Sequence, residues 1–102
     1  MTYTAIYVTF PKKDVAEEII EKLLHEKLIA CSNVFPIKSM YWWKQKINKD
    51  DEFVGLLKTS FANVEKVETR IKDLHPFEVP CIMRLDVSAN KEYEDWVNHE
   101  VQ

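Results

Sequence analysis

The chain has 102 residues, of which 46% are hydrophobic and 30% are charged, and its one glycine and four prolines are not gathered into a linker. This composition predicts a single globular domain over residues 1–102. The net charge of −3 argues against the cationic surface that binds nucleic acid, and the lack of a long apolar segment or leader-like N-terminus predicts a cytoplasmic protein with no membrane partner.

The first part of the chain predicts a strand followed by a helix. Apolar side chains occupy alternate positions of residues 3–10, which is the period of a strand. Asp14 and Glu17 resemble a capping box, and apolar residues then recur every three or four positions. We therefore expect a helix from about residue 15 to about residue 27.

A long β-hairpin is predicted next. Residues 28–34 are typical of an irregular strand, and Pro36 separates them from an aromatic-rich strand over about residues 37–47. The polar residues 48–51 are the expected turn, and residues 53–59 beyond them are again strand-like. Both arms are long for a protein of this size.

A second helix follows the hairpin. Apolar residues recur at helical spacing over residues 64–74, with Ser60 or Asn63 available as the N-cap. The pair His75-Pro76 ends this helix, because proline disfavours the helical conformation of the residue before it.

A last strand and a terminal helix complete the predicted elements. Apolar residues alternate with polar ones over residues 81–88, which predicts a strand with one apolar face. Asn90 is predicted to cap a final helix whose inward side chains are Tyr93, Trp96 and Val97.

The element order is β-α-β-β-α-β with an additional C-terminal helix. This order predicts an α+β, ferredoxin-like sandwich in which two helices pack on one face of an antiparallel sheet. We expect the other face to have no helix over it, and therefore to be polar or buried against another subunit. The run Tyr41-Trp42-Trp43 places rings on both faces of one strand, so at least one ring meets solvent, a ligand or a neighbouring chain.

Five blocks of residues, spread over nearly the whole chain, match one known family in the family's order. They are Thr9-Phe10-Pro11, Leu28-Ile29-Ala30-Cys31-Ser32-Asn33, Ser39-Met40-Tyr41-Trp42-Trp43, Glu52 with Lys58-Thr59, and His75-Pro76-Phe77 with Pro80. On these blocks the chain resembles the CutA family.

The resemblance implies a tight homotrimer in which long hairpins of neighbouring subunits pair edge to edge, and a kinship of architecture with PII signalling proteins. It also implies a link to tolerance of divalent cations, copper in particular. A trimer would remove the unpaired strand edges and bury the leftover rings.

Two positions depart from the family pattern. The family usually has glycine where this chain has Gln45, which puts any close backbone approach there in doubt. Copper ligands proposed for a bacterial member match Val8, Leu74 and His75 here, so only the histidine is retained.

Three residues are candidate metal ligands, and each has a competing interpretation. His75 could bind a metal through its imidazole, or its cation could favour the negative end of the preceding helix. Cys31 and Cys81 could supply thiolates to copper, but isolated reduced cysteines in apolar stretches more often behave as buried hydrophobes. His25 and His99 are expected on the surface.

Tyr41, Trp43, Glu52 and Lys58 are candidates for a cleft that binds a small ligand, because aromatic walls with a few charged groups are typical of such clefts. The alternative is subunit packing, in which Lys58 pairs with Glu52 or another acid.

The predicted function is that of a non-enzymatic homotrimer that binds Cu²⁺, another divalent metal or a small ligand between subunits, without an organic cofactor. The alternative is a trimeric scaffold or PII-like signalling protein with an indirect link to metals. An enzyme is disfavoured because no loop glycines are available for a backbone oxyanion hole, and an RNA-binding domain because residues 53–58 lack the required motif.

Overall fold

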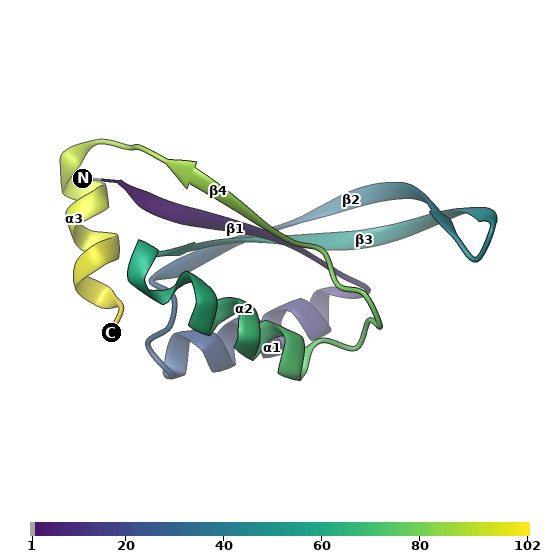
Figure 1. Ribbon diagram of the computed structural model, residues 1–102, viewed down its shortest axis with the longest axis horizontal. Helices are drawn as coiled ribbons and strands as arrows, with labels where there is room; N and C mark the ends of the chain where they lie inside the picture. Colours follow the sequence, from purple (N-terminus) through teal and green to yellow (C-terminus); the bar gives the residue numbers. More distant parts are fainter. Residues whose placement is uncertain (1) are drawn as a thin grey trace.

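The computed structural model describes residues 2–102 and confirms the ferredoxin-like plan. Within these residues the elements are β1 (Tyr3–Phe10), α1 (Lys13–His25), β2 (Cys31–Trp43), β3 (Lys46–Thr59), the 3-10 turn η1 (Phe61–Asn63), α2 (Val64–Leu74), β4 (Ile82–Val87) and α3 (Lys91–Glu100). The strands form one antiparallel sheet in the order β2-β3-β1-β4 (Figure 1).

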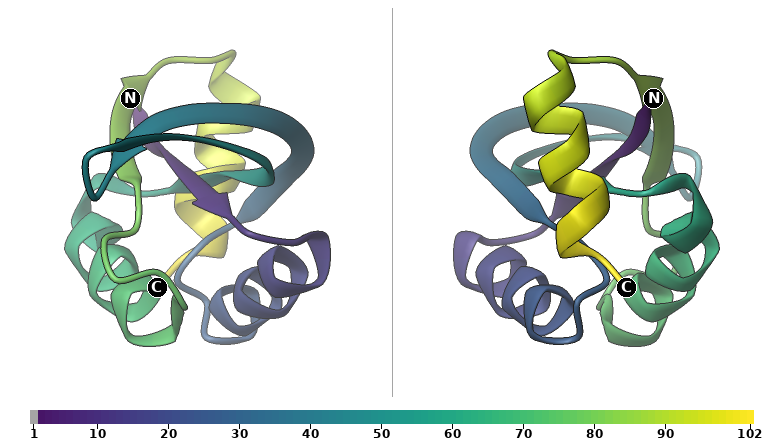
Figure 2. Two further views of the ribbon diagram at one scale, coloured as in Figure 1. Left: turned by 90° about the vertical axis from the view of Figure 1, so that its right-hand side faces the viewer. Right: turned by 90° about the vertical axis from the view of Figure 1, so that its left-hand side faces the viewer.

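The main core lies between the sheet and the helices α1 and α2, which share one of its faces (Figures 1 and 2). Alternate residues of β1 face these helices and are fully buried. The central members of this core are Ile6, Val8, Phe10, Leu23, Leu57, Val67 and Ile71. The opposite side of the sheet is called the open face below.

The helix α3 crosses one end of the open face, so the expectation that no helix covers this face was wrong there. The rings of Tyr3 and Tyr93 meet edge to face with centroids 5.8 Å apart. Tyr3 and Ala5, which alternate with the core residues of β1 and so point away from α1 and α2, are both buried. None of the helices of residues 2–102 covers the rest of the open face, as predicted.

The apolar side of β4 lies on the open face. Arg84 points to the helix side, where its guanidinium forms an ion pair with Glu68 of α2 at 2.6 Å. Met83 and Leu85 therefore point the other way and are 48% and 39% exposed. Ile82, which breaks the alternation in the sequence, packs against the main core.

The β2–β3 hairpin extends beyond the body of the molecule (Figure 1), and the molecule is accordingly 44 Å long and only 24 Å and 21 Å across. Its turn is Lys44-Gln45, so the prediction of a turn at residues 48–51 was wrong. Those residues belong to β3, where Lys49 pairs with Met40. Polar residues are tolerated there because the overhanging arms have no core to cover.

The two turn residues adopt the left-handed conformation that a two-residue type I′ turn requires. Lys44 has a φ of 50° and Gln45 a φ of 65°. The amide of Asn48 donates to the carbonyl oxygens of Lys46 and Trp43, at 3.1 and 3.4 Å, and so supports the turn. This geometry explains why glycine is favoured where this chain has Gln45.

Replacing Gln45 with glycine is expected to raise the free energy of unfolding by about 0.5–1 kcal/mol. A non-glycine residue in the left-handed region costs about 1–2 kcal/mol, and the added freedom of glycine in the unfolded chain offsets roughly half of this. Urea denaturation checks it. Lys49→Gly, at an extended position of the same hairpin, is the matched control and should destabilise the protein; a loss of stability in both variants would contradict the explanation.

Two helix starts differ in detail from the predictions. The helix α1 begins at Lys13, with Lys12 at the N-cap and no side-chain cap, so the predicted capping box was wrong. Asp14 lies inside the first turn and accepts a hydrogen bond from the Val15 amide instead. Asn63 does occupy the N-cap of α2, but its side chain donates to the carbonyl of Gln102.

The terminal helix α3 follows Asn90 as predicted, and Val97 is fully buried. Trp96 is 42% exposed, so its predicted inward position was wrong. It packs on the outer side of Tyr93, with ring centroids 5.7 Å apart.

Candidate functional site

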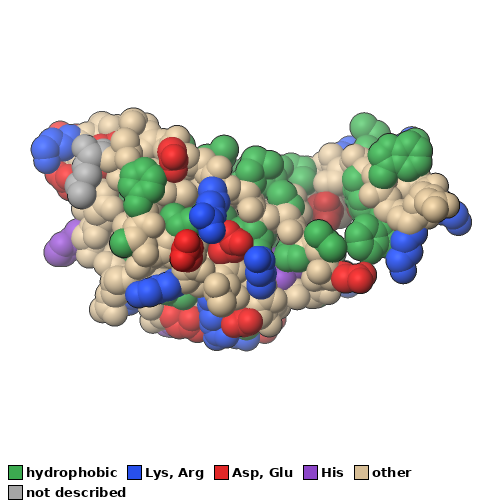
Figure 3. Space-filling view, in the orientation of Figure 1, with side chains coloured by type: hydrophobic (Ala, Val, Ile, Leu, Met, Phe, Trp, Pro, Cys, Tyr) green, Lys and Arg blue, Asp and Glu red, His purple; other side chains and the backbone are tan. Residues whose placement is uncertain are grey.

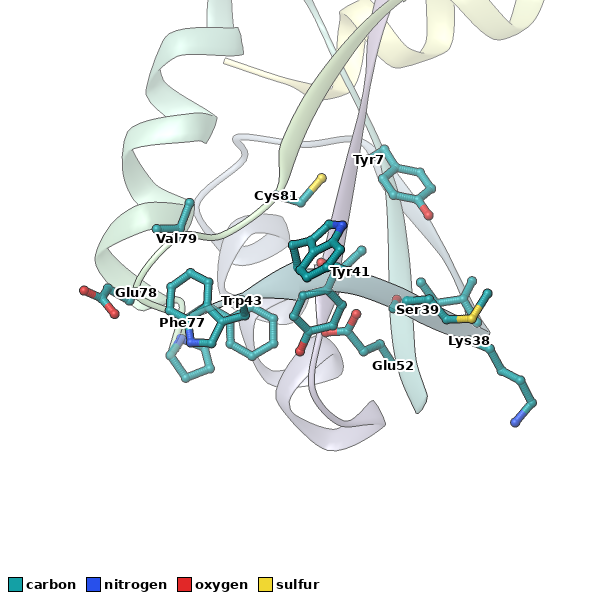
Figure 4. Close-up of a pocket in the computed structure, with 15 residues that line it drawn as sticks. Tyr7, Lys38, Ser39, Tyr41, Trp43, Glu52, Phe77, Glu78, Val79 and Cys81 are labelled. Carbon is teal, nitrogen blue, oxygen red and sulfur yellow. The ribbon is translucent and has the colours of Figure 1, made fainter. Parts of the chain in front are cut away.

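A hollow of about 920 Å³ lies on the open face, between the hairpin and the loop that joins α2 to β4 (Figure 4). We call it the hairpin hollow. It is lined by Tyr7, Thr9, residues 37–43, Glu52, residues 76–79 and Cys81. Its volume falls within the range of small-molecule pockets, and most of its lining is aromatic or aliphatic.

Three of the four predicted cleft residues meet in the hairpin hollow. Tyr41, Trp43 and Glu52 line it, whereas Lys58 does not. Glu52 and Lys58 are six residues apart in β3 and therefore roughly 20 Å apart, so they cannot pair within one chain. Within residues 2–102, the buried ammonium of Lys58 instead donates to the side-chain oxygen of Asn33.

Two carboxylates line the hairpin hollow, the buried Glu52 and the exposed Glu78. Glu52 is only 7% exposed, and within residues 2–102 it makes no hydrogen bond or ion pair. Burial raises the pKa of the neighbouring Cys81 thiol, and the charge of Glu52 raises it further. The hydrogen bond to Asp50 raises the pKa of the Tyr41 hydroxyl, with smaller contributions from burial and from Glu52.

His75 joins the strand β1 to the loop after α2. Its Nδ1 accepts a hydrogen bond from the Phe77 amide at 3.1 Å, so Nε2 carries the proton and donates to the Thr9 carbonyl at 2.7 Å. The ring stacks on Phe10 with centroids 5.2 Å apart. Burial lowers its pKa, against opposing effects of Thr9 and Glu52. A neutral imidazole disfavours the predicted cation at the end of α2, and a metal could reach either nitrogen only by breaking one of these bonds.

The stability of the protein is expected to fall between pH 7 and pH 5 because of His75. The unfolded chain takes up a proton near the ordinary histidine pKa of about 6.5, whereas the folded state takes it up only at lower pH. Stability is therefore full above that value and is lost as the pH falls below it. Urea midpoints at the two pH values measure the loss.

The control for this prediction compares two histidines. His75→Gln should flatten the pH dependence, since its amide can still donate to Thr9 but does not titrate. His25→Gln, on the exposed side of α1, should leave the dependence unchanged. An unchanged slope in His75→Gln would contradict the assignment.

The two cysteines are free thiols, as predicted, but they lie at separate places and neither is in the core. Cys31 lies beneath α3, where its sulfur and the Tyr93 hydroxyl are 3.1 Å apart, while Cys81 lines the hairpin hollow. Within residues 2–102, no three His, Cys, Asp or Glu side chains converge to hold a metal ion. His25 and His99 are exposed, which confirms their predicted surface positions.

Tyr7 and Phe77 are among the residues of the hairpin hollow that the sequence analysis missed. Tyr7 lies on the side of β1 that faces away from the core, and Phe77 follows the His75-Pro76 pair. The alternation of β1 could have placed Tyr7 on the open face. Nothing in the local sequence brings Phe77 to the hairpin, because that contact depends on the path of the loop.

The sequence matches the family model described as CutA1 divalent ion tolerance protein over residues 4–100. The chain belongs to this family. A "Divalent-cation tolerance protein CutA" of Pyrococcus horikoshii is 42% identical over 98 residues, which cover 95% of this chain and 96% of that relative. The CutA1 family thus accounts for almost the whole sequence.

Solved CutA structures have the same fold. A protein of Archaeoglobus fulgidus, described as a periplasmic divalent cation tolerance protein, superposes with a TM-score of 0.95 at 38% identity, covering 98% of this chain and 99% of that one. The "PII-like protein CutA" of Nostoc superposes with a TM-score of 0.91 at 30% identity, covering 100% and 98%. The likeness to PII-type architecture is thereby confirmed.

These comparisons leave the cellular location as a prediction, since the Archaeoglobus protein is described as periplasmic. Within residues 2–102, none of the helices has the length and apolar character needed to cross a bilayer.

Proposed function

We propose that the chain acts in divalent-metal tolerance, copper in particular, as a homotrimer that binds a metal ion or a small ligand between subunits. The observation that carries the proposal is the exposed apolar surface of the open face and hairpin, next to a buried, unpaired carboxylate (Figure 3). The family name and the names of the relatives support the metal link.

The open face has the character of a subunit interface. Phe35, Met83 and Leu85 point onto it and are 38–48% exposed. Met40 and Trp42, on the other side of the projecting hairpin, are more than 70% exposed. The strands β2 and β4 are the two edges of the sheet. Exposed apolar patches and long unpaired edges are hazards that closed oligomers remove, which supports a trimer.

A metal in the hairpin hollow would bind first to Glu52 and Cys81. Two ligands do not complete a typical site, so side chains of a second copy would supply the rest. The raised pKa of Cys81 means that the metal must displace a proton from the thiol. His75 could join by giving up one hydrogen bond, whereas Cys31 would belong to a different site near α3.

Light scattering and calorimetric titration with Cu²⁺ and Zn²⁺ test this proposal. We expect light scattering to give a particle of three chains. We expect the metal affinity to fall at least about tenfold in Cys81→Ser, because a thiolate ligand is lost. His75→Ala should weaken binding less. Cys31→Ala, a change of the same residue type outside the hairpin hollow, is the matched control and should match the unaltered protein.

Two results would count against this function. A particle of 12.1 kDa, the mass of one chain, would contradict the proposed trimer. Equal and small heats of metal binding in all variants would contradict the proposed metal site. A trimer without metal heats would favour the alternative of a scaffold or PII-like signalling protein, which the PII-like relative supports. The absence of enzymatic activity stays a prediction, for which assays with acyl phosphates should show no turnover.

A further inference from the structure

Aromatic rings gather at the end of the hairpin hollow that contains Glu52. Figure 4 shows Tyr41 and Trp43 of β2 close to Phe77 of the loop, with the Glu52 side chain beside Tyr41 and with Tyr7 farther along. Tyr41 and Trp43 are each 40% exposed, so part of each ring is open to a ligand.

The unpaired charge of the hairpin hollow is negative. Lys38 on its rim pairs with Asp51 at 2.9 Å and points away from the interior (Figure 4). Burial lowers the pKa of His75, and the hydrogen bond that its Nδ1 accepts from the Phe77 amide requires the neutral ring. Within residues 2–102, Glu52 has no hydrogen-bond or ion-pair partner, although only 7% of it is exposed. A largely buried carboxylate with no partner in the protein attracts a cation into the hollow.

We propose that the hairpin hollow binds a small organic cation, an alkylated ammonium, whose charge lies between the Glu52 carboxylate and the rings of Tyr41 and Trp43. Ring faces attract a cation through their quadrupole, and cages of aromatic rings are a known means of binding quaternary ammonium groups. The inference rests on the proposed function in that it names the ligand class of the same hollow.

Other cations fit these residues less well. A bare metal ion needs several donor atoms, but within residues 2–102 no three ligand-type side chains converge: the hollow offers the carboxylates of Glu52 and Glu78 and a thiol whose pKa is raised. A primary ammonium has three N–H donors and is strongly hydrated, so it loses more on leaving water for a hollow walled largely by rings. An alkylated ammonium has few or no N–H groups and is weakly hydrated, so rings and one carboxylate suffice.

The test uses the assembled protein with choline as the probe and its uncharged isostere, 3,3-dimethylbutan-1-ol, as the comparison. Broadening and saturation transfer of the methyl NMR signals measure binding. We expect choline to bind about tenfold more tightly than the isostere, which corresponds to the upper part of the cation–π range. Glu52→Gln and Trp43→Leu should each weaken choline binding by about tenfold. Glu52→Gln should leave binding of the uncharged isostere unchanged.

The matched control is Glu65→Gln, which neutralises an exposed carboxylate on α2 and should bind choline as the unaltered protein does. Circular dichroism and light scattering establish that each variant is folded and assembled. The unaltered protein alone can overturn the inference, if it binds choline and the isostere equally tightly. If choline does not bind, while calorimetry shows metal binding and light scattering shows three chains, the inference is wrong and the proposed function stands.

Discussion

Replacing Phe10 with alanine is expected to lower the free energy of unfolding by about 3–5 kcal/mol, the usual cost of removing a buried ring. The Phe10 side chain is fully buried at the end of β1 and stacks on His75. Its edge also lies against Gly55, where an added Cβ would come within 3.1 Å of the ring. Such close packing on several sides leaves little room for collapse into the cavity.

Urea or thermal denaturation at a fixed protomer concentration measures this loss, because oligomer stability depends on concentration. The matched control is Phe61→Ala at the start of η1, where the ring is 51% exposed. That change should cost no more than about 0.5 kcal/mol. Similar losses in both variants would show that Phe10 is not a central part of the core.

The double substitution of Met83 and Leu85 by glutamate is expected to dissociate the proposed trimer. Both side chains stand on the open face of β4, where residues 2–102 leave them 48% and 39% exposed. If subunits bury this face, each glutamate brings an uncompensated charge into the interface, and the desolvation cost is several kcal/mol per charge. The mass by light scattering should then fall from three chains to one.

Phe61→Glu, which adds the same charge at another exposed apolar site, is the control for this experiment and should leave the mass unchanged. Circular dichroism of the doubly substituted protein separates a folded protomer from an unfolded one. A trimer that survives both glutamates would contradict the assignment of the open face as the interface.

The candidate site was predictable from the sequence only in part. Tyr41, Trp43 and Glu52 were expected together, because aromatic rings and a carboxylate recur on neighbouring strands of one hairpin, and the structure does place them in one hollow. Lys58 was grouped with them but lies elsewhere, because six residues of extended strand separate it from Glu52 by roughly 20 Å, a spacing that the sequence already contained.

The turn illustrates why local signals failed. Residues 48–51 are polar, as turns often are, whereas Lys44-Gln45 contains no glycine or asparagine and adopts a left-handed conformation despite its side chains. The pairing of thirteen residues of β2 with β3 imposes that conformation. A register decided by many hydrogen bonds outweighs a local preference of about 1–2 kcal/mol per residue.

His75 is a second case in which tertiary contacts decided the chemistry. Its sequence position, at the end of a helix and before proline, is consistent with a metal ligand or with a cation. The hydrogen bonds to Thr9 and from Phe77 come from segments that only the folded chain brings together, and burial against Phe10 holds the ring neutral.

The sequence by itself determined the element order, the ferredoxin-like plan and the family, because alternation and helical spacing are local patterns and the family blocks span the chain. Only the tertiary structure decided which apolar residues are covered. Met83 and Leu85 have the pattern of a core face, yet Arg84 turns that face outward by pairing with α2. Periodicity shows that residues share a side of a strand, but which side meets a helix depends on the packing of segments far apart in the chain.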